Sequence, residues 1–227
     1  MDAVARVWSL IEAGGWVMYP LLALSVLSVA LTIERTLFWI GPAARVDRGW
    51  LERTVSAFRD ADWPGVIAQA EGERALVARY AARLAADARR TRPDANPSVA
   101  AAALVAVEDV RAAIERFAAV HATIITAAPM LGILGTVTGI IQSFRLISGD
   151  GAGVDEVVTD PTLVAAGIAE ALFTTAAGLV IALVTLFPHA LFRAASERRL
   201  VVLEAIAAAA EEGVAAPSGA EPTESEA

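Results

Sequence analysis

Three long stretches of this sequence contain no charged residue. They cover residues 16–33, 117–144 and 171–192, and the apolar character extends to residue 40 after the first and begins near residue 163 before the third. Because a helix rises ~1.5 Å per residue, each stretch can cross the ~30 Å hydrocarbon core of a bilayer. The pattern therefore predicts an all-α integral membrane protein with three transmembrane helices, at residues 16–40, 121–147 and 163–192.

Apolar and charged positions alternate with helical spacing in the segments between and after these spans. Residues 48–58 and 64–90 are predicted to be amphipathic helices, and the prolines of residues 91–97 separate them from the next helical segment. With Ser98 as N-cap, that helix is predicted to run without interruption into the second span, over roughly 50 residues. The third span is predicted to continue in the same way to about residue 212.

The arginines predict how the chain is oriented. Most of them lie between residues 41 and 116, and three more follow the third span, whereas the loop after the second span is acidic. The positive-inside rule therefore places residues 41–120 and the helix of residues 193–212 in the cytoplasm. It places the amphipathic N-terminal segment, residues 1–15, and the loop of residues 148–162 on the outer side of the membrane. Residues 213–227, rich in Pro, Ser and Glu, are predicted to be a disordered acidic tail.

Composition excludes several classes of function. Hydrophobic residues make up 56% of the chain, and it has no Cys, so disulfides, thiolate metal sites and Cys nucleophiles are absent. The two histidines, His121 and His189, are too few and too far apart in the sequence to suggest a metal cluster. A net charge of −8 argues against nucleic acid as a partner. No nucleophile–base–acid set or phosphate-binding loop is visible, so we expect neither an enzyme nor a bound cofactor.

The second span combines glycines with hydroxyl residues. Gly135 and Gly139 form a GxxxG step that lets helix backbones approach closely, and Pro129 is expected to bend the helix near its middle. One face is predicted to carry Gly132, Thr136, Gly139 and Ser143. Taken alone, this face fits tight helix packing with hydroxyls bonded to their own backbone equally well.

The third span contains an acidic residue, Glu170. A carboxylate at membrane depth costs a few kcal/mol at least and is a functional candidate by default, the alternative being that it reaches the interface. Thr174 shares its face, whereas Thr175 lies ~140° round the helix. Thr136 and Thr175 each lie 11 residues from the predicted outer end of their span, so antiparallel neighbours would carry them at similar depth. Hydroxyls with a carboxylate suit a narrow hydrated path for protons.

Residues 131–144, and residues 168–172 with Thr175, Gly178 and Leu179, resemble the signature of the ExbB/TolQ family, which is related more distantly to MotA. Residues 122–129 match as well. The resemblance implies a homopentamer whose second and third spans surround a pore holding a dimeric, single-span ExbD/TolR-like partner. It also implies that this partner carries the proton-binding Asp, that Thr136, Glu170 and Thr175 line the pore around it, and that the complex is a proton-driven motor of the bacterial inner membrane.

The sequence departs from that family near the inner end of the third span. Val184 stands where the family usually has Pro, and His189 and Ala190 align with a common Tyr-Asn pair. His189 is interpreted either as a titrating group at the ion exit or, preferably, as an interfacial residue without ionic role. Two other functions stay open: a membrane scaffold that conducts nothing, and a sodium-driven stator, which the hydroxyls of Thr138 and Thr174 would suit. Nothing in the sequence indicates whether import, envelope maintenance, gliding or secretion is powered.

Overall fold

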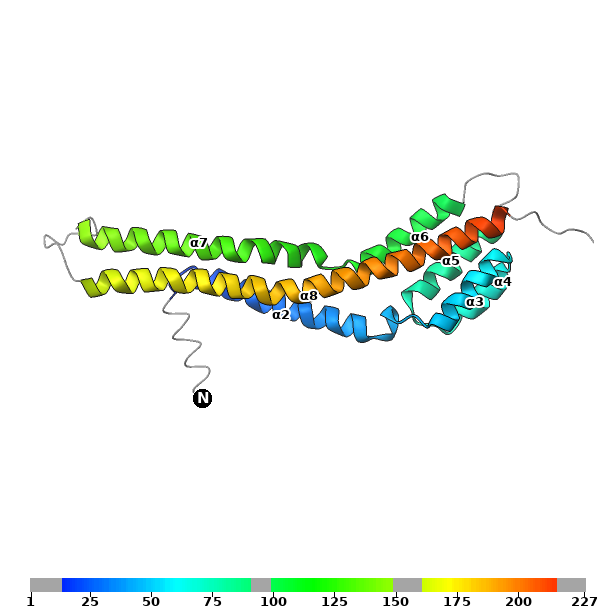
Figure 1. Cartoon of the computed structure of the whole chain (residues 1–227), viewed down its shortest axis with the longest axis horizontal. Helices are drawn as coiled ribbons and strands as arrows, with labels where there is room; N and C mark the ends of the chain where they lie inside the picture. The colour runs from blue at the N-terminus through cyan, green and yellow to red at the C-terminus, as the bar shows by residue number, and fades with distance from the viewer. Residues whose placement is uncertain (1–13, 91–98, 149–160, 216–227) are drawn as a thin grey trace, which may run out of the picture. The chain divides into compact units, whose positions relative to one another are not determined.

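A computed structural model describes residues 14–90, 99–148 and 161–215, which contain helices and no strand. These residues form two compact units. The apolar unit comprises residues 14–34, 117–148 and 161–191, and the charged unit comprises residues 35–90, 99–116 and 192–215. Figure 1 labels the helices of both units.

Three helices are long and apolar enough to cross a membrane: α2 (Met18–Ile40), α7 (Ala118–Ser148) and α8 (Pro161–Ala215). Only 17% of the most apolar part of α2, and 28% of that of α7 and of α8, is buried inside the chain. Large apolar side chains such as Met130 and Leu172 are therefore exposed. A surface of this kind needs lipid or other apolar protein surface around it. The prediction of an all-α membrane protein with three spans is confirmed.

In the apolar unit, α7 and the first part of α8 run antiparallel, and the start of α2 packs on them (Figure 1). Val17, directly before α2, and Leu21, in its first turn, are 1% and 0% exposed and form a small core with Ala128 of α7. Both α7 and α8 continue through an internal proline, Pro129 and Pro188 respectively. The hydroxyls of Ser28 on α2 and Thr185 on α8 share a buried hydrogen bond of 2.6 Å.

The charged unit folds around an apolar core of its own. Its elements are the end of α2, a 3-10 turn η1 (Pro42–Ala44), α3 (Arg48–Arg59), α4 (Trp63–Ala70), α5 (Leu76–Arg90), α6 (Val99–Ile114) and the last part of α8. Phe58, Leu84, Leu203 and Ile206 are each 0% exposed within this core. Their helical spacing explains why α3, α5 and the end of α8 turn one apolar face inward.

Two aspartates begin the helices of this unit at defined residues. The backbone N–H of Trp50 donates to Asp47 at the start of α3, and that of Gly65 donates to Asp62 at the start of α4, both at 2.9 Å. The single helix predicted for residues 64–90 is wrong, because α4 ends at Ala70 and α5 begins at Leu76. Gly72 between them has a φ of 90°, a left-handed conformation that ends a helix.

The continuous helix predicted from residue 98 into the second span is also wrong. α6 ends at Ile114, α7 begins at Ala118, and Phe117 between them has a φ of 65°. The buried guanidinium of Arg35 donates to the carbonyl oxygens of Ala113, at 3.2 and 3.3 Å, and of Ile114, at 3.2 Å. These bonds satisfy carbonyls that end a helix without an intrahelical partner, so the break is stabilised. Ser98 lies outside the described residues.

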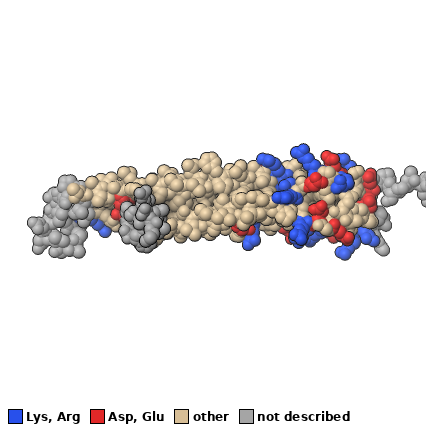
Figure 2. All heavy atoms as spheres, turned by 90° about the horizontal axis from the view of Figure 1, so that it is seen from below, with Lys and Arg blue, Asp and Glu red and all other residues tan. Residues whose placement is uncertain are grey.

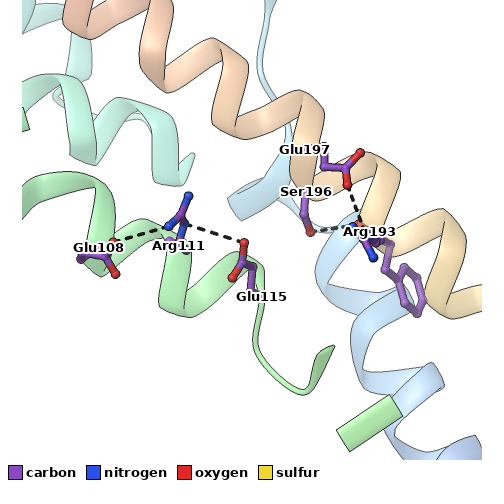
Figure 3. A network of polar contacts seen from close by, with 7 residues as sticks. Glu108, Arg111, Glu115, Arg193, Ser196 and Glu197 are labelled. Carbon is purple, nitrogen blue, oxygen red and sulfur yellow. Dashed lines mark hydrogen bonds and ion pairs between the residues drawn. The ribbon is translucent and has the colours of Figure 1, made fainter. Parts of the chain in front are cut away.

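The expected extension of the third span is present, since α8 is a single helix of 55 residues ending at Ala215. Charged side chains gather over the charged unit (Figure 2). On α6, Arg111 lies between Glu108 at 3.6 Å and Glu115 at 3.8 Å, and on α8 Arg193 pairs with Glu197 at 3.0 Å (Figure 3). Most of the predicted N-terminal segment, outer loop and acidic tail falls at residues 1–13, 149–160 and 216–227, outside the described residues.

Candidate functional site

The closest approach in the apolar unit is a strip of contact between α7 and α8, which we call the seam: Gly132, Gly135, Gly139 and Ser143 of α7 with Gly167, Ala171, Thr174, Thr175 and Gly178 of α8. A Cβ added at Gly132 would lie 2.9 Å from both the Thr174 carbonyl oxygen and the Thr175 Cα. One at Gly139 would lie 2.9 Å from the Ala171 Cβ, and one at Gly178 would overlap the Ala128 carbonyl. Small residues are therefore required for the two backbones to touch.

Two hydroxyl groups of α8 meet one carbonyl of α7 within the seam. Thr175 Oγ1 donates to the Gly132 carbonyl oxygen at 2.8 Å, and Thr174 Oγ1 lies 3.3 Å from the same oxygen. Thr174 also donates to the Ala171 carbonyl at 2.8 Å and is 1% exposed. Helical geometry places Thr174 on the face of Glu170 and Thr175 ~140° from it, yet both threonines reach the same acceptor because Gly132 has no side chain.

The antiparallel pairing expected from depth is present, but its register differs by one helical turn. Thr175 bonds to Gly132 and therefore lies at the level of Gly132, whereas the prediction placed it at the level of Thr136, four residues further along α7. Thr136 is half-buried at the edge of the predicted face, where its hydroxyl donates to Ile133 at 2.6 Å. Ser143, also predicted on this face, is 3% exposed and donates to Gly139 at 2.9 Å. Gly135 stands in the seam where Thr136 was expected, against the Thr174 side chain.

Glu170 lies one turn before Thr174 on α8 and is half-buried. Its carboxyl group faces the beginning of the first span, where it fills the space beside Gly15 that a side chain would occupy. This neighbour is missing from the prediction, because Gly14 and Gly15 were counted with the N-terminal segment. The sequence feature that could have indicated this contact is the glycine pair directly before the first uncharged stretch.

A second polar cluster brings the two histidines together. The rings of His121 and His189 stack with centroids 6.0 Å apart and planes 20° from parallel. His121 is 1% exposed, its Nδ1 lies 3.0 Å from the Phe117 carbonyl oxygen, and its Nε2 lies 3.4 Å from Thr32 Oγ1. The distance between the two histidines in the sequence therefore did not indicate their distance in space. The sequence analysis also did not predict that the Thr32 hydroxyl of α2 lies beside them. Among the described residues no group of three His, Cys, Asp or Glu side chains could hold a metal.

The seam and Glu170 combine hydroxyls, backbone carbonyls and one carboxylate within a membrane-spanning bundle. In hydrocarbon every such group needs a partner or water, and a carboxylate marks an ion path by default. The hydroxyls of Thr136, Thr174 and Thr175 can each both donate and accept a hydrogen bond. Groups of these kinds can coordinate a small cation or take part in proton transfer.

The chain is similar to one family of membrane proteins and to individual members of it. Residues 73–205 match the family described as MotA/TolQ/ExbB proton channel. ExbB-like 3 of Synechocystis sp., provisionally described as a biopolymer transport protein, is 34% identical over 193 residues, 85% of this chain and 87% of the relative. ExbB-like 1 of the same organism is 34% identical over 174 residues, 76% of this chain and 65% of the relative. An ExbB homolog of Methanothermobacter thermautotrophicus is 47% identical over 62 residues, 27% of this chain and 19% of the relative.

Proposed function

Because this chain belongs to the MotA/TolQ/ExbB proton channel family, we propose that it is the pore-forming subunit of a motor driven by the proton-motive force. The observation that carries the proposal is the position of Glu170, one turn from two threonines that converge on one carbonyl in a membrane-spanning bundle. A bundle that served only to hold the chain in lipid would gain nothing from a carboxylate there, since its burial costs a few kcal/mol.

In this proposal five copies of the chain surround the single spans of a dimeric ExbD/TolR-like partner in a bacterial inner membrane. The N-terminus and the loop of residues 148–162 face the periplasm, and the charged unit faces the cytoplasm. The exposed apolar faces of α7 and α8, with Val137 at 49% and Leu183 at 54%, supply the surface that copies and partner would cover. Protons crossing the pore would protonate and release the partner's Asp in turn, while Thr136, Glu170 and Thr175 relay or gate the transfer.

The relative motion of pentamer and dimer would then transmit work through the partner to the periplasm or envelope. No cofactor is needed, since the coupling ion is the only species transferred. The seam contributes the rigid wall of such a pore, because its backbones touch and leave no freedom to part.

The first test is the composition of the complex. The chain is co-expressed with a neighbouring small gene that encodes one transmembrane helix bearing an Asp, and the native mass of the detergent-extracted complex is measured. Five copies of this chain with two of the partner are expected. A monomer or dimer that ignores the partner would contradict the pore.

The second test is proton flux into vesicles that contain the complex. Glu170→Ala and Thr136→Val should each abolish or strongly reduce the flux and the powered process. Thr123→Val is a matched control, because its exposed hydroxyl donates only to Ala119 on its own helix at 2.9 Å. Replacing the proton gradient by a sodium gradient separates a proton-driven from a sodium-driven complex.

One observation favours a second function, a scaffold that conducts no ion. The hydroxyls of Thr136, Thr138 and Ser143 each donate to a carbonyl of their own helix, as they would in a packing face without transport. For a scaffold, glycine substitutions in the seam would abolish function while Thr136→Val and Glu170→Ala would leave it intact. The flux assay therefore decides between the two.

A further inference from the structure

The turn that precedes α2 lies directly against the acidic residue of α8. Gly15 has a φ of 62°, and a Cβ built on it would overlap Glu170 Oε1 and lie 3.1 Å from the carboxyl carbon. The carboxyl group thus rests in the space that a side chain at residue 15 would take. The preceding residue, Gly14, has different neighbours. A Cβ at Gly14 would meet the flexible side chain of Met18 and lie 3.4 Å from Thr174 Cγ2.

This turn is held in place by the bundle. The backbone N–H of Met18 donates to the Gly15 carbonyl at 3.1 Å, so Gly15 is tied to the first turn of α2. That turn is anchored by Val17 and Leu21, which are buried against α7. The wall beside the carboxyl group is therefore fixed backbone, while the carboxyl group itself is the end of a flexible side chain.

The two kinds of glycine in the apolar unit differ in what a side chain would displace. At Gly132 and Gly178 the obstacle is backbone, so a side chain there must push the helices apart. At Gly15 the obstacle is the end of the Glu170 side chain, which can rotate to another rotamer at little cost. A substitution at Gly15 should therefore displace the carboxyl group without wedging helix backbones apart, although the new residue must adopt the left-handed φ of 62°.

We propose that Gly15 is a positioning residue for Glu170, and that the start of the first span forms a third wall of the site, beside α7 and α8. The bare backbone at Gly15 gives the carboxyl group its resting place, next to the first turn of α2 and one turn from Thr174. The inference deepens the proposed function, since it rests on Glu170 taking part in proton transfer.

The test uses Gly15→Ala in the full chain, co-expressed with the partner and studied in membrane vesicles. The direct measurement is the rate at which Glu170 reacts with the apolar carboxyl reagent dicyclohexylcarbodiimide across a range of pH, followed by peptide mass. We expect Gly15→Ala to change this rate several-fold and to shift the pH profile of proton flux. Gly14→Ala should do neither, because it does not touch the carboxyl group.

A second control measures the effect of left-handed backbone strain at a glycine remote from the site. Gly72 also has a positive φ, 90°, but a Cβ there would meet nothing within 4 Å. Gly72→Ala therefore imposes left-handed strain without displacing a neighbour, and it should leave carbodiimide labelling and flux as they are. If Gly15→Ala does not accumulate in the membrane, Gly15→Asn takes its place, because Asn tolerates the left-handed conformation and still fills the space.

The double variant decides whether Gly15 acts through the carboxyl group. In a Glu170→Gln background, adding Gly15→Ala should cause no further change in flux. The proposal is overturned if labelling and pH profile in Gly15→Ala match the wild type, if Gly14→Ala reproduces its effect, or if its effect on flux persists in the Gln background. If instead Gly15→Ala alters labelling while Glu170→Ala conducts normally, Gly15 still positions the carboxyl group and the proposed proton path through Glu170 is what fails.

Discussion

In the charged unit the ion pairs lie on the surface, whereas in the apolar unit hydroxyls such as that of Thr174 bond inside the helix bundle. Arg193 and Glu197 form their 3.0 Å ion pair with side chains 73% and 63% exposed. Thr174, by contrast, is 1% exposed and its hydroxyl bonds to backbone carbonyls. Water solvates charges well, so the first pair contributes little, but hydrocarbon offers a hydroxyl no alternative partner.

The same difference extends to apolar packing. The charged unit buries large side chains such as Phe58 and Leu84, because removing them from water is favourable. The apolar unit instead brings glycines into its seam, because lipid is as apolar as leucine and helix association there depends on close contact. We therefore expect the two units to fail under different substitutions, and four measurements can separate them.

The largest effect is expected for Phe58→Ala in the charged unit. Removing a fully buried aromatic side chain costs roughly 3–5 kcal/mol, through lost burial and the cavity left behind. Hydrogen exchange of the α3 and α5 amides in the detergent-solubilised protein should rise accordingly, while α7 amides stay protected. Val201→Ala, at a position 62% exposed on α8, is the control and should change little. Equal effects of the two variants would contradict the assigned core.

Gly132→Val should destabilise the apolar unit by roughly 1–3 kcal/mol, because its side chain meets backbone of α8 that cannot yield. The measurement is the thermal unfolding midpoint in detergent. Ala119→Val adds the same kind of bulk at an exposed position of α7 and serves as the control. A Gly132→Val protein as stable as the control would show that the seam is looser than the contacts imply.

Tyr80→Phe tests the charged unit by pH. The Tyr80 hydroxyl is buried without a hydrogen-bond partner among the described residues, and burial, with the charge of Glu211 second, raises its pKa to about 12. In the unfolded chain the phenol ionises from its ordinary pKa of 10.0, so stability is unaffected below that pH and falls as pH rises towards about 12. The Phe variant should lose this alkaline decline and be about as stable at neutral pH, within about 1 kcal/mol. If the Phe variant loses stability at alkaline pH as the wild type does, the loss is caused by the ionisation of other groups.

The smallest effect is expected for Arg111→Ala. Its two ion pairs, at 3.6 and 3.8 Å, join exposed side chains of α6 and of Glu115 directly after it, and such pairs contribute about 0–1 kcal/mol. Unfolding midpoints at low and high salt should differ less for the variant than for the wild type. A loss comparable to that of Phe58→Ala would mean that the surface charges support the unit more than their exposure suggests.

Much of the fold can be predicted from the sequence, because length and absence of charge fix the spans. The helix breaks at residues 71–75 and 115–117 cannot, since each depends on a tertiary or backbone feature. Gly72 adopts a left-handed conformation that the neighbouring residues do not predict. Arg35 caps α6 although it lies 78 residues away from Ala113 in the sequence. Phe117 at a positive φ runs against its own propensity, which no pattern of apolar positions predicts.

The face of α7 that meets α8 was predicted from the sequence, whereas the contacts around it were not. The spacing of Gly132, Gly139 and Ser143 placed them together because helical periodicity fixes a face. The one-turn error in register arose because span ends were estimated from charges, while the register is set by which glycines meet which threonines. The Gly15–Glu170 contact and the stacking of His121 on His189 join separate helices, and periodicity within one helix says nothing about them.

The shared acceptor at Gly132 has a mechanical consequence. The Thr175 bond of 2.8 Å ends on this oxygen, and the Thr174 hydroxyl, which donates to Ala171, lies 3.3 Å from it, so sliding α8 along α7 by a single residue would disturb both contacts. A rotation centred on that oxygen lengthens neither contact, so splaying of the helices is opposed instead by the close contacts on either side of it, at Gly139 and Gly178. The Gly132 carbonyl therefore fixes the register of the two helices, and the flanking glycines fix the angle at which they cross.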